Sequence, residues 1–357
     1  MINTKKILMI WDMSMIDLTK PIDASYELNN ICNLMCPQCA RNTIKDGVLQ
    51  KNPGTSGNPL PTLDNYQMSL DDFKTSFDNI GNVGLVKFYG TVSENIASSN
   101  FFEINEYIFS KKSRILTSTN GSLKTKELWY ELGQLYKKQE TSRMVFCLDG
   151  LHEELSLYRI NASYDKIIEN ALSFMEGGGK TEWRMIIFKH NQHQLEDAKK
   201  LAKQYGFDKF TYQYSNRKDI PEPFTFKGKQ YNLEPQDKWK GWETIKNKRL
   251  EHTGVGNIVC KFKEVNSVYI DYLCRVWPCC YLPSGKHLLG EQKFYDDYYY
   301  DMSNNLIDKS LEEIMNDVFY DSLQKSWEKE ETCLKPCSNT CSFTDSVRTS
   351  NYRVDVW

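Results

Sequence analysis

The chain has 357 residues, of which 40% are hydrophobic and 26% are charged, and its net charge is −2. These values are ordinary for a soluble globular protein, and the small net charge argues against a constitutive nucleic-acid binder. No run of about 18 apolar residues occurs, so we expect no transmembrane helix. The N-terminus starts like a signal peptide, but Asp12 interrupts its short apolar run. We therefore expect a cytoplasmic protein.

The first predicted elements are a lead-in segment and a strand that ends in a cysteine-rich loop. We assign no chemistry to residues 1–24, and residues 25–29 are typical of a strand. Cys32, Cys36 and Cys39 follow at a C-x3-C-x2-C spacing. Three thiolates on one tight loop can hold three irons of a [4Fe-4S] cluster and leave the fourth iron open for chemistry. A zinc site and a disulfide are the alternatives, but zinc prefers four ligands and a disulfide needs an oxidising compartment.

Residues 46–66 are predicted to form an irregular segment, which is either a substrate loop or a disordered bulge. After it, predicted strands and helices alternate. Apolar periodicity and flanking turn residues predict strands at 85–89, 114–119, 144–148, 183–188 and 209–214, and helices at 68–79, 101–109, 128–136, 164–175 and 194–205. Such alternation predicts an α/β protein with a parallel sheet and right-handed crossovers. Polar residues at the carboxyl ends of these strands mark the edge where a site is expected.

Two further regions complete the chain. Residues 216–258 form a connector in which lysines and aromatic residues alternate, a composition that suits either a solvated linker or a grip on single-stranded nucleic acid. Residues 259–357 begin with a strand at 267–271, which a turn separates from residues 275–280, and they contain seven of the eleven cysteines. Because a reducing cytosol disfavours disulfides, this clustering favours metal ligation.

The cysteine loop, with Asn33-Leu34 between its thiols and Glu27-Leu28-Asn29 before it, resembles the radical S-adenosylmethionine (radical SAM) superfamily. The resemblance implies a partial (β/α)6 TIM-like barrel over residues 25–215. It also implies a SAM-binding [4Fe-4S] cluster on Cys32, Cys36 and Cys39. In this family, reductive cleavage of SAM yields a 5′-deoxyadenosyl radical that takes a hydrogen atom from a substrate.

The resemblance extends to the residues that would contact SAM at successive strand ends. Glu94, in the segment from Gly90 to Asn95, would accept a hydrogen bond from the SAM ammonium, although Ser93 and Asn95 replace the glycine and proline that are usual there. Arg159 could bind the SAM carboxylate. The other expected contacts are Gly90, Ser93, Asn120, Asp149 and Asn191. Cys147 is either a catalytic hydrogen donor at the barrel mouth or a buried structural thiol.

The C-terminal cysteines resemble those of a SPASM or twitch extension, which implies a small α+β domain with one auxiliary [4Fe-4S] cluster. We expect Cys260, Cys279, Cys337 and Cys341 as its ligands, with Cys333 as the main rival. A structural zinc is the alternative. Cys274 stands where the hairpin of such a domain usually has a turn glycine, and the longer SPASM run of cysteines is missing.

The function implied is that of a radical SAM enzyme acting on a peptide or protein side chain. Modification of a nucleic acid or nucleoside is the alternative, and a metal-stabilised binding module without catalysis is a remote one. The resemblance also implies an electron donor, either a reductase or a flavodoxin or ferredoxin. The reaction outcome stays open because many outcomes begin with the same hydrogen abstraction.

Overall fold

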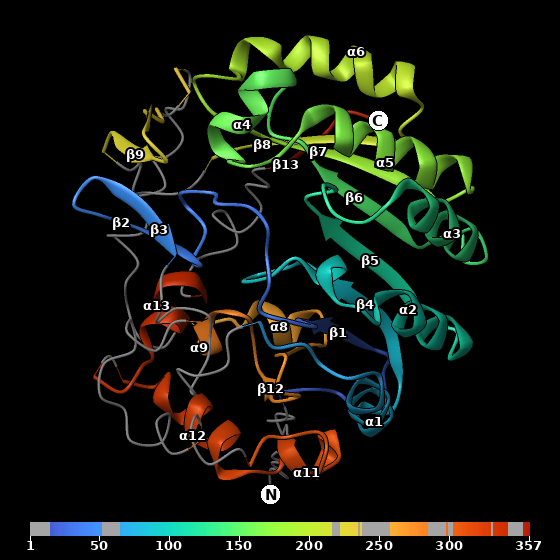
Figure 1. Ribbon diagram of the computed structural model, residues 1–357. Helices are drawn as coiled ribbons and strands as arrows, with labels where there is room; N and C mark the ends of the chain where they lie inside the picture. Colours follow the sequence, from blue (N-terminus) through green and yellow to red (C-terminus); the bar gives the residue numbers. More distant parts are fainter. Residues whose placement is uncertain are drawn as a thin grey trace, which may run out of the picture.

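The alternation of strands and helices builds one large sheet, as the sequence predicts. In the computed structural model, nine strands lie in the order β12-β11-β1-β4-β5-β6-β7-β8-β13 (Figure 1). The strands from β11 to β8 are all parallel to their neighbours, and the two edge strands are antiparallel. Their bounds are β1 (Ile22–Tyr26), β4 (Val83–Phe88), β5 (Arg114–Thr119), β6 (Arg143–Cys147), β7 (Thr181–Ile187), β8 (Lys209–Tyr214), β11 (Ser267–Ile270), β12 (Val276–Trp277) and β13 (Arg353–Asp355).

The structure describes residues 15–51, 65–215, 222–234, 236–237, 258–284, 298, 303–329, 331–341 and 353–357. Within these ranges, no helix has the length and apolar character that crossing a membrane requires. The aromatic and lysine residues at 238–257 of the connector, including Trp239 and Trp242, lie outside the described residues.

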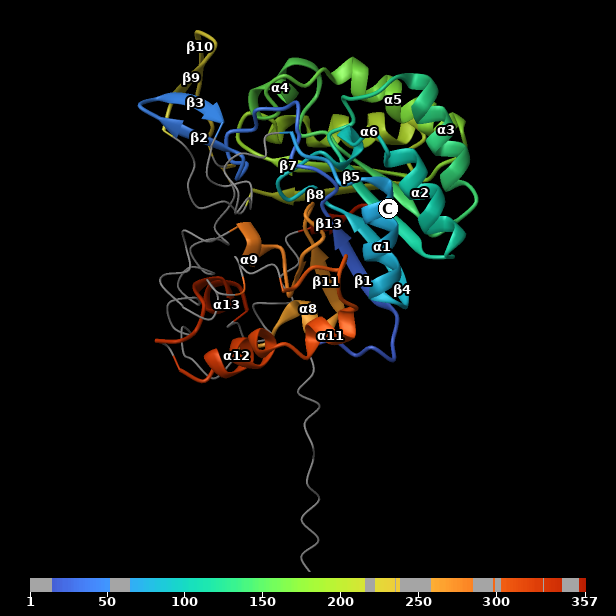
Figure 2. The ribbon, with the colours of Figure 1, turned by 60° about the horizontal axis from the view of Figure 1, so that its bottom comes forward.

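Five long helices cover the outer face of the sheet (Figures 1 and 2). They are α1 (Leu70–Ile80), α2 (Phe101–Ser110), α3 (Lys126–Tyr136), α5 (Tyr164–Glu176) and α6 (Leu195–Tyr205). Ser69, Thr125 and Ser163 cap α1, α3 and α5 by accepting a backbone N–H with their side-chain oxygens. The short α4 (Leu155–Tyr158) follows β6.

The C-terminal part contributes α8 (Lys261–Glu264), α9 (Tyr281–Ser284), α11 (Leu311–Met315), α12 (Val318–Ser326) and α13 (Lys335–Cys341). In both ribbon views, α9, α12 and α13 lie together on the side away from α5 and α6 (Figures 1 and 2). Between the two parts, β11 pairs in parallel with β1, so that Ser25 faces Tyr269. The C-terminal strands therefore extend the sheet of the core.

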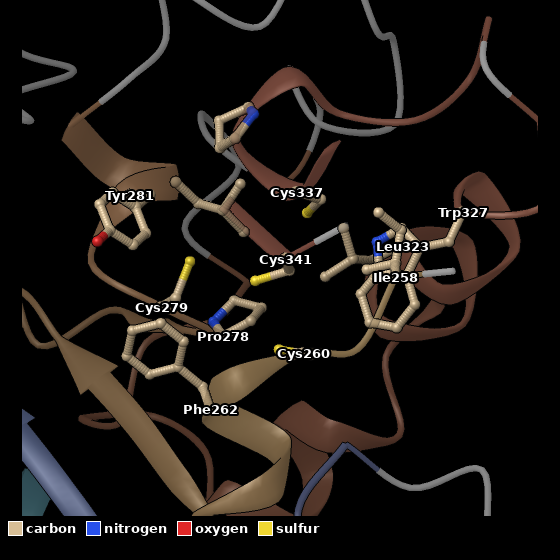
Figure 3. Close-up of a pocket in the computed structure, with 12 residues that line it drawn as sticks. Ile258, Cys260, Phe262, Pro278, Cys279, Tyr281, Leu323, Trp327, Cys337 and Cys341 are labelled. Atoms are coloured by element: carbon tan, nitrogen blue, oxygen red, sulfur yellow. The ribbon is translucent and has the colours of Figure 1, made fainter. Parts of the chain in front are cut away.

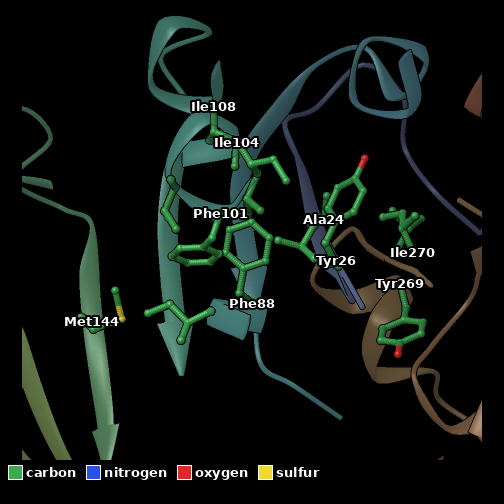
Figure 4. Close-up of a cluster of buried hydrophobic side chains, with 14 of the residues drawn as sticks. Ala24, Tyr26, Phe88, Phe101, Ile104, Ile108, Met144, Tyr269 and Ile270 are labelled. Carbon is green, nitrogen blue, oxygen red and sulfur yellow. The ribbon is translucent and has the colours of Figure 1, made fainter. Parts of the chain in front are cut away.

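Apolar side chains of alternate strand positions pack against the helices and form the main core. Phe88 on β4 meets Phe101 on α2 with 5.5 Å between ring centroids, and Tyr26 on β1 meets Phe73 on α1 at 4.9 Å. Ile270 of β11 belongs to the same buried cluster (Figure 4). Burial of such rings stabilises the fold by roughly 1.5–3 kcal/mol each, and it fixes the strand ends relative to one another.

A small second sheet, in the order β10-β9-β3-β2, lies beside the cysteine loop. It consists of β2 (Asn42–Lys45), β3 (Val48–Lys51), β9 (Phe224–Phe226) and β10 (Lys229–Tyr231). Phe224 and Tyr231 stack at 5.3 Å and are buried in one cluster with Met35. Phe224 therefore packs under the cysteine loop, and its ring is not accessible for stacking on a base.

The predicted element boundaries hold best in the middle of the chain. The predicted strands at 114–119 and 209–214 are β5 and β8 without shift. The first strand starts three residues earlier than predicted and ends at Tyr26, and part of the segment expected to be irregular forms β3. After the turn that follows β11, the segment 275–280 contains the short strand Val276–Trp277.

Candidate active site

The cysteine loop follows β1 at the carboxyl edge of the parallel strands. Met35 N donates to Ile160 O at 3.1 Å, and Asn42 Nδ2 donates to Cys36 O at 2.9 Å. These bonds, together with the packing of Met35, fix the loop on the small sheet. All three thiols are partly buried, and burial raises the pKa of Cys32 to about 11 and the pKa of Cys36 further. With their pKa raised in this way, Cys32 and Cys36 carry protons near neutral pH, so the binding of these two thiols to iron would be coupled to proton release.

Glu94 follows β4 and reaches the end of β5. Its carboxylate accepts from Thr119 Oγ1 and from Asn120 N, each at 2.8 Å, and only 5% of the residue is exposed. Burial raises its pKa to about 7, and its charge is close enough to raise the pKa of Cys32 as well. The sequence placed Glu94 at the SAM site, and the structure puts it beside the cysteine loop.

Gly90 and Ser93 shape the loop that carries Glu94. Gly90 has φ +62°, and a Cβ there would lie 2.3 Å from Ser93 O, so no other residue fits. Ser93 Oγ donates to Glu27, which is 1% exposed and also accepts from Thr91 N and, at 3.2 Å, from Val92 N. The hydroxyl of Ser93 is thus hydrogen-bonded to the buried Glu27 carboxyl group, which also binds the backbone of the same loop.

Asn95 compensates for the missing proline of the usual motif. Its Oδ1 accepts from Leu28 N at 2.7 Å and ties the start of the short helix η1 (Asn95–Ala97) to the end of β1. The buried Glu27 and Asn95 together restrain the backbone of the segment from Gly90 to Asn95. In the sequence, the only indication of this arrangement is that Ser93 and Asn95 stand where glycine and proline are usual.

Asn120 joins β5 to the cysteine loop. Its Nδ2 donates to Asn33 Oδ1 at 3.0 Å and lies 3.9 Å from Cys32 Sγ, which is within reach of a weak N–H···S bond. Asn33 Nδ2 in turn donates to Ser122 Oγ at 2.8 Å. The amide of Asn120 is therefore held against the thiol that would bind iron.

Asp149 and Arg159 form a buried ion pair on the other side of the loop, with 2.7 Å between Arg159 Nε and Asp149 Oδ2. Asp149 Oδ1 accepts from Ile186 N at 2.7 Å. Although burial disfavours its charged form, Asp149 helps to raise the pKa of Arg159, and the charge of Arg159 acts on both Cys36 and Cys147. Cys147, at the end of β6, is partly buried, and burial raises its pKa.

Asn191 is placed differently from the other expected contacts. It is fully buried, accepts from Phe188 N at 2.7 Å, and donates to Asp149 O and Ile186 O at 2.7 and 2.8 Å. All of these partners are backbone groups. Its amide holds the ends of β6 and β7 together, so the structure favours a positioning role over a direct contact with a ligand.

Four C-terminal thiols line one apolar cavity, and they are the four that the sequence favoured. Cys260 precedes α8, Cys279 follows β12, and Cys337 and Cys341 lie on α13 (Figure 3). The Cys341 thiol lies within hydrogen-bonding reach of Cys260 and raises its pKa, while burial raises the pKa of Cys337 to about 12. Cys333 is buried but is absent from the lining of this cavity.

The donor sets fit iron-sulfur clusters. Each set brings thiols together from positions that backbone hydrogen bonds fix, and the second set has apolar walls that exclude water. Within the described residues, no three Cys, His, Asp or Glu side chains converge closely enough to hold a single metal ion. A cubane cluster needs no such convergence, since each thiolate binds a different iron.

Comparisons with known proteins agree with this geometry. No protein-family model matches the chain. It is 24% identical over 303 residues to the antilisterial bacteriocin subtilosin biosynthesis protein AlbA of Bacillus subtilis, in a match that covers 81% of this chain and 61% of AlbA. The chain thus spans less than two thirds of that relative's length.

Solved structures share the fold. Native anSMEcpe with bound AdoMet is 16% identical with a TM-score of 0.51, covering 90% of this chain and 89% of that one. Streptococcus suis SuiB bound to its precursor peptide SuiA is 14% identical with a TM-score of 0.52, covering 85% and 66%. The chain therefore shares the fold of these structures. Its cysteine loop lies at the carboxyl edge of the parallel strands, and most of its other cysteines lie in the C-terminal part.

Proposed function

We propose that this chain is a radical SAM enzyme that takes a hydrogen atom from a peptide or protein side chain. The observation that carries the proposal is the contact of Asn120 with both the Glu94 carboxylate and Cys32 Sγ, because it brings the expected SAM contact and the expected cluster ligand together. When bound, the cluster and SAM supply the radical chemistry, in which one-electron reduction of the sulfonium gives methionine and a 5′-deoxyadenosyl radical.

The chain's own residues would bind and orient SAM. Glu94 is aimed at the cysteine loop, so its ionised carboxylate would hold the SAM ammonium there. Arg159 already donates through Nε to Asp149 and would present its terminal nitrogens to the SAM carboxylate. Cys147 lies near Arg159, where a thiol could return a hydrogen atom. Cys32, Cys36 and Cys39 would hold the first cluster, and Cys260, Cys279, Cys337 and Cys341 an auxiliary one.

A peptide is the favoured substrate class. Solved structures of this fold include SuiB with a precursor peptide and anSMEcpe with AdoMet and the Cp18Cys peptide. The nucleic-acid alternative rested on the aromatic residues of the connector, of which Phe224 is buried. We propose that a reduced flavodoxin or ferredoxin, or a reductase, donates the electron, and that the protein works in the cytoplasm.

Iron and 5′-deoxyadenosine together test the proposal. After anaerobic reconstitution, we expect about eight irons per chain for two cubane clusters, and 5′-deoxyadenosine from SAM once a reductant is added. Changing Cys32, Cys36 and Cys39 to alanine should leave about four irons and abolish 5′-deoxyadenosine. Cys274→Ala changes a thiol outside both proposed ligand sets and is the control. It should keep the iron content and the 5′-deoxyadenosine formation of the wild type. Full iron content in the triple variant, or no 5′-deoxyadenosine from the wild type, would refute the proposal.

A further inference from the structure

A second cavity, of about 250 Å³, lies on the inner side of the sheet where the core meets the C-terminal extension. The core contributes Glu27, directly after β1, and Lys87 and Tyr89 at the end of β4. The extension contributes Phe262 on α8 and Tyr269 on β11, together with Cys280.

The walls of the cavity connect to the surroundings of both sets of thiols. On one side its wall includes Glu27 and Thr91, and Glu27 holds the loop that leads directly to Glu94. On the other side, Phe262 lines both this cavity and the one that contains Cys260 and Cys279. A group bound here is therefore one loop away from the proposed SAM site, and the hydrogen to be removed must lie close to the reacting centre.

The lining indicates what would bind. Rings of Tyr89, Phe262 and Tyr269 provide aromatic walls. The charge of Lys87 is neutralised by Asp23, with 2.6 Å between Nζ and Oδ2. Lys261 lines the cavity and is exposed, so it places a cationic side chain at the rim. The volume is below the roughly 300–1,000 Å³ of sites that take drug-sized molecules, so it suits a single large side chain.

We propose that this cavity binds one aromatic side chain of the peptide substrate, and that Lys261 at its rim binds a carboxylate on the neighbouring residue of the same peptide. The proposal rests on the proposed function and adds the class of side chain that is recognised. Aromatic walls and one exposed cation make the site selective for an acidic residue next to an aromatic one, and the neutralised Lys87 leaves the interior of the site without net attraction for an anion.

Saturation-transfer NMR on the reconstituted full chain with SAM tests the pocket. The probes are N-acetyl-phenylalaninamide and N-acetyl-alaninamide, which share an acetyl methyl group as the reporter. We expect saturation of the phenylalanine probe at least threefold greater than that of the alanine probe. Val265→Trp should remove this difference, because Val265 lines the cavity and is 55% exposed, so a larger side chain can fill the space without disturbing the core. Val318→Trp, at a 75% exposed position outside the cavity, is the control and should keep it.

The rim is tested with a pair of charged dipeptides. N-acetyl-Glu-Phe-amide should be saturated more strongly than N-acetyl-Lys-Phe-amide. In Lys261→Gln, the two dipeptides should be saturated equally. Equal saturation of the phenylalanine and alanine probes, an unchanged preference in Val265→Trp, or no preference between the charged dipeptides would overturn the proposal. These results are independent of 5′-deoxyadenosine formation. An enzyme that cleaves SAM but shows no aromatic preference refutes only this inference, and a protein with the preference that does not cleave SAM refutes only the proposed function.

Discussion

At the scale of single residues, Glu94 is the group whose chemistry the structure defines most sharply. Both of its oxygens are bound, by Thr119 and by Asn120. Because the residue is almost fully buried, the carboxyl keeps its proton up to a higher pH than usual, with a pKa raised to about 7. A bound ammonium would favour the ionised form, so SAM binding should be coupled to loss of this proton.

We therefore predict that SAM affinity depends on pH through Glu94. Only the carboxylate attracts the ammonium, so affinity should rise with pH up to about 7 and should be about fivefold to tenfold weaker at pH 6 than at pH 7.3. The SAM amine keeps its proton in this range, because α-amino groups titrate near 8. Glu94→Gln should bind SAM roughly 10- to 100-fold more weakly, as expected for the loss of a charged hydrogen bond, and without this pH dependence.

Equilibrium dialysis of radiolabelled SAM against the anaerobic protein measures both effects. Glu106→Gln, at an exposed position of α2, is the control and should behave like the wild type. If Glu94→Gln keeps the pH dependence of the wild type, another group carries it.

At the scale of elements, the turn between β11 and β12 shows how the fold positions an auxiliary ligand. Asp271 Oδ2 accepts from Arg275 Nε at 2.8 Å and from Trp277 Nε1 at 3.0 Å, and its Oδ1 accepts from two backbone N–H groups of the turn. Arg275 is fully buried. Cys274 takes φ +62° at the turn, where glycine is usual. Cys279 lies two residues beyond β12, so this network fixes its position.

We predict that Asp271→Asn lowers the free energy of unfolding by about 3–5 kcal/mol, because it leaves a buried guanidinium without its counter-charge. With the hairpin loosened, iron content should fall from about eight per chain toward four. Chemical denaturation and iron analysis measure the two effects. Asp321→Asn removes a solvent-exposed pair with Lys325 and should cost less than about 1 kcal/mol. Wild-type stability and iron content in Asp271→Asn would show that the network is dispensable.

The elements also show which features of the fold can be predicted from the sequence and which cannot. Strands such as β5 and β8 follow from local patterns of apolar residues and turns. The proposed ligand thiols follow from the spacing of Cys32, Cys36 and Cys39 and, for the C-terminal set, from the family resemblance. The pairing of β1 with β11 could not be predicted, because it depends on contacts between distant segments. The support that Glu27 gives to the Ser93 loop is hidden for the same reason, since Glu27 looks like any other polar residue at a strand end. The sequence predicts correctly that Asn191 lies at the carboxyl edge of the sheet. It does not reveal that the side chain is fully buried.

At the scale of the whole molecule, one sheet runs through both the predicted core at 25–215 and the predicted extension at 259–357. We predict that the two parts unfold together. Because β1 is hydrogen-bonded on one side to β4 and on the other to β11, loss of the extension would expose an edge of the core. In hydrogen-exchange mass spectrometry at increasing urea, peptides from β1, β6 and β11 should lose protection at the same urea concentration. Loss of β11 at a lower concentration than β6 would mean two independent domains.

The pairing of Asp23 with Ser267 has a consequence for how the protein is made. At roughly 5–20 residues per second, β1 leaves the ribosome on the order of 10–50 s before its neighbour β11. During this time the edge of β1 is unpaired, and unpaired edges are prone to aggregate. The cysteine loop that follows β1 also lacks its finished surroundings. Expression with slowed synthesis or with added chaperones should therefore affect the yield of soluble chain more than iron supply does, and iron should enter a completed chain.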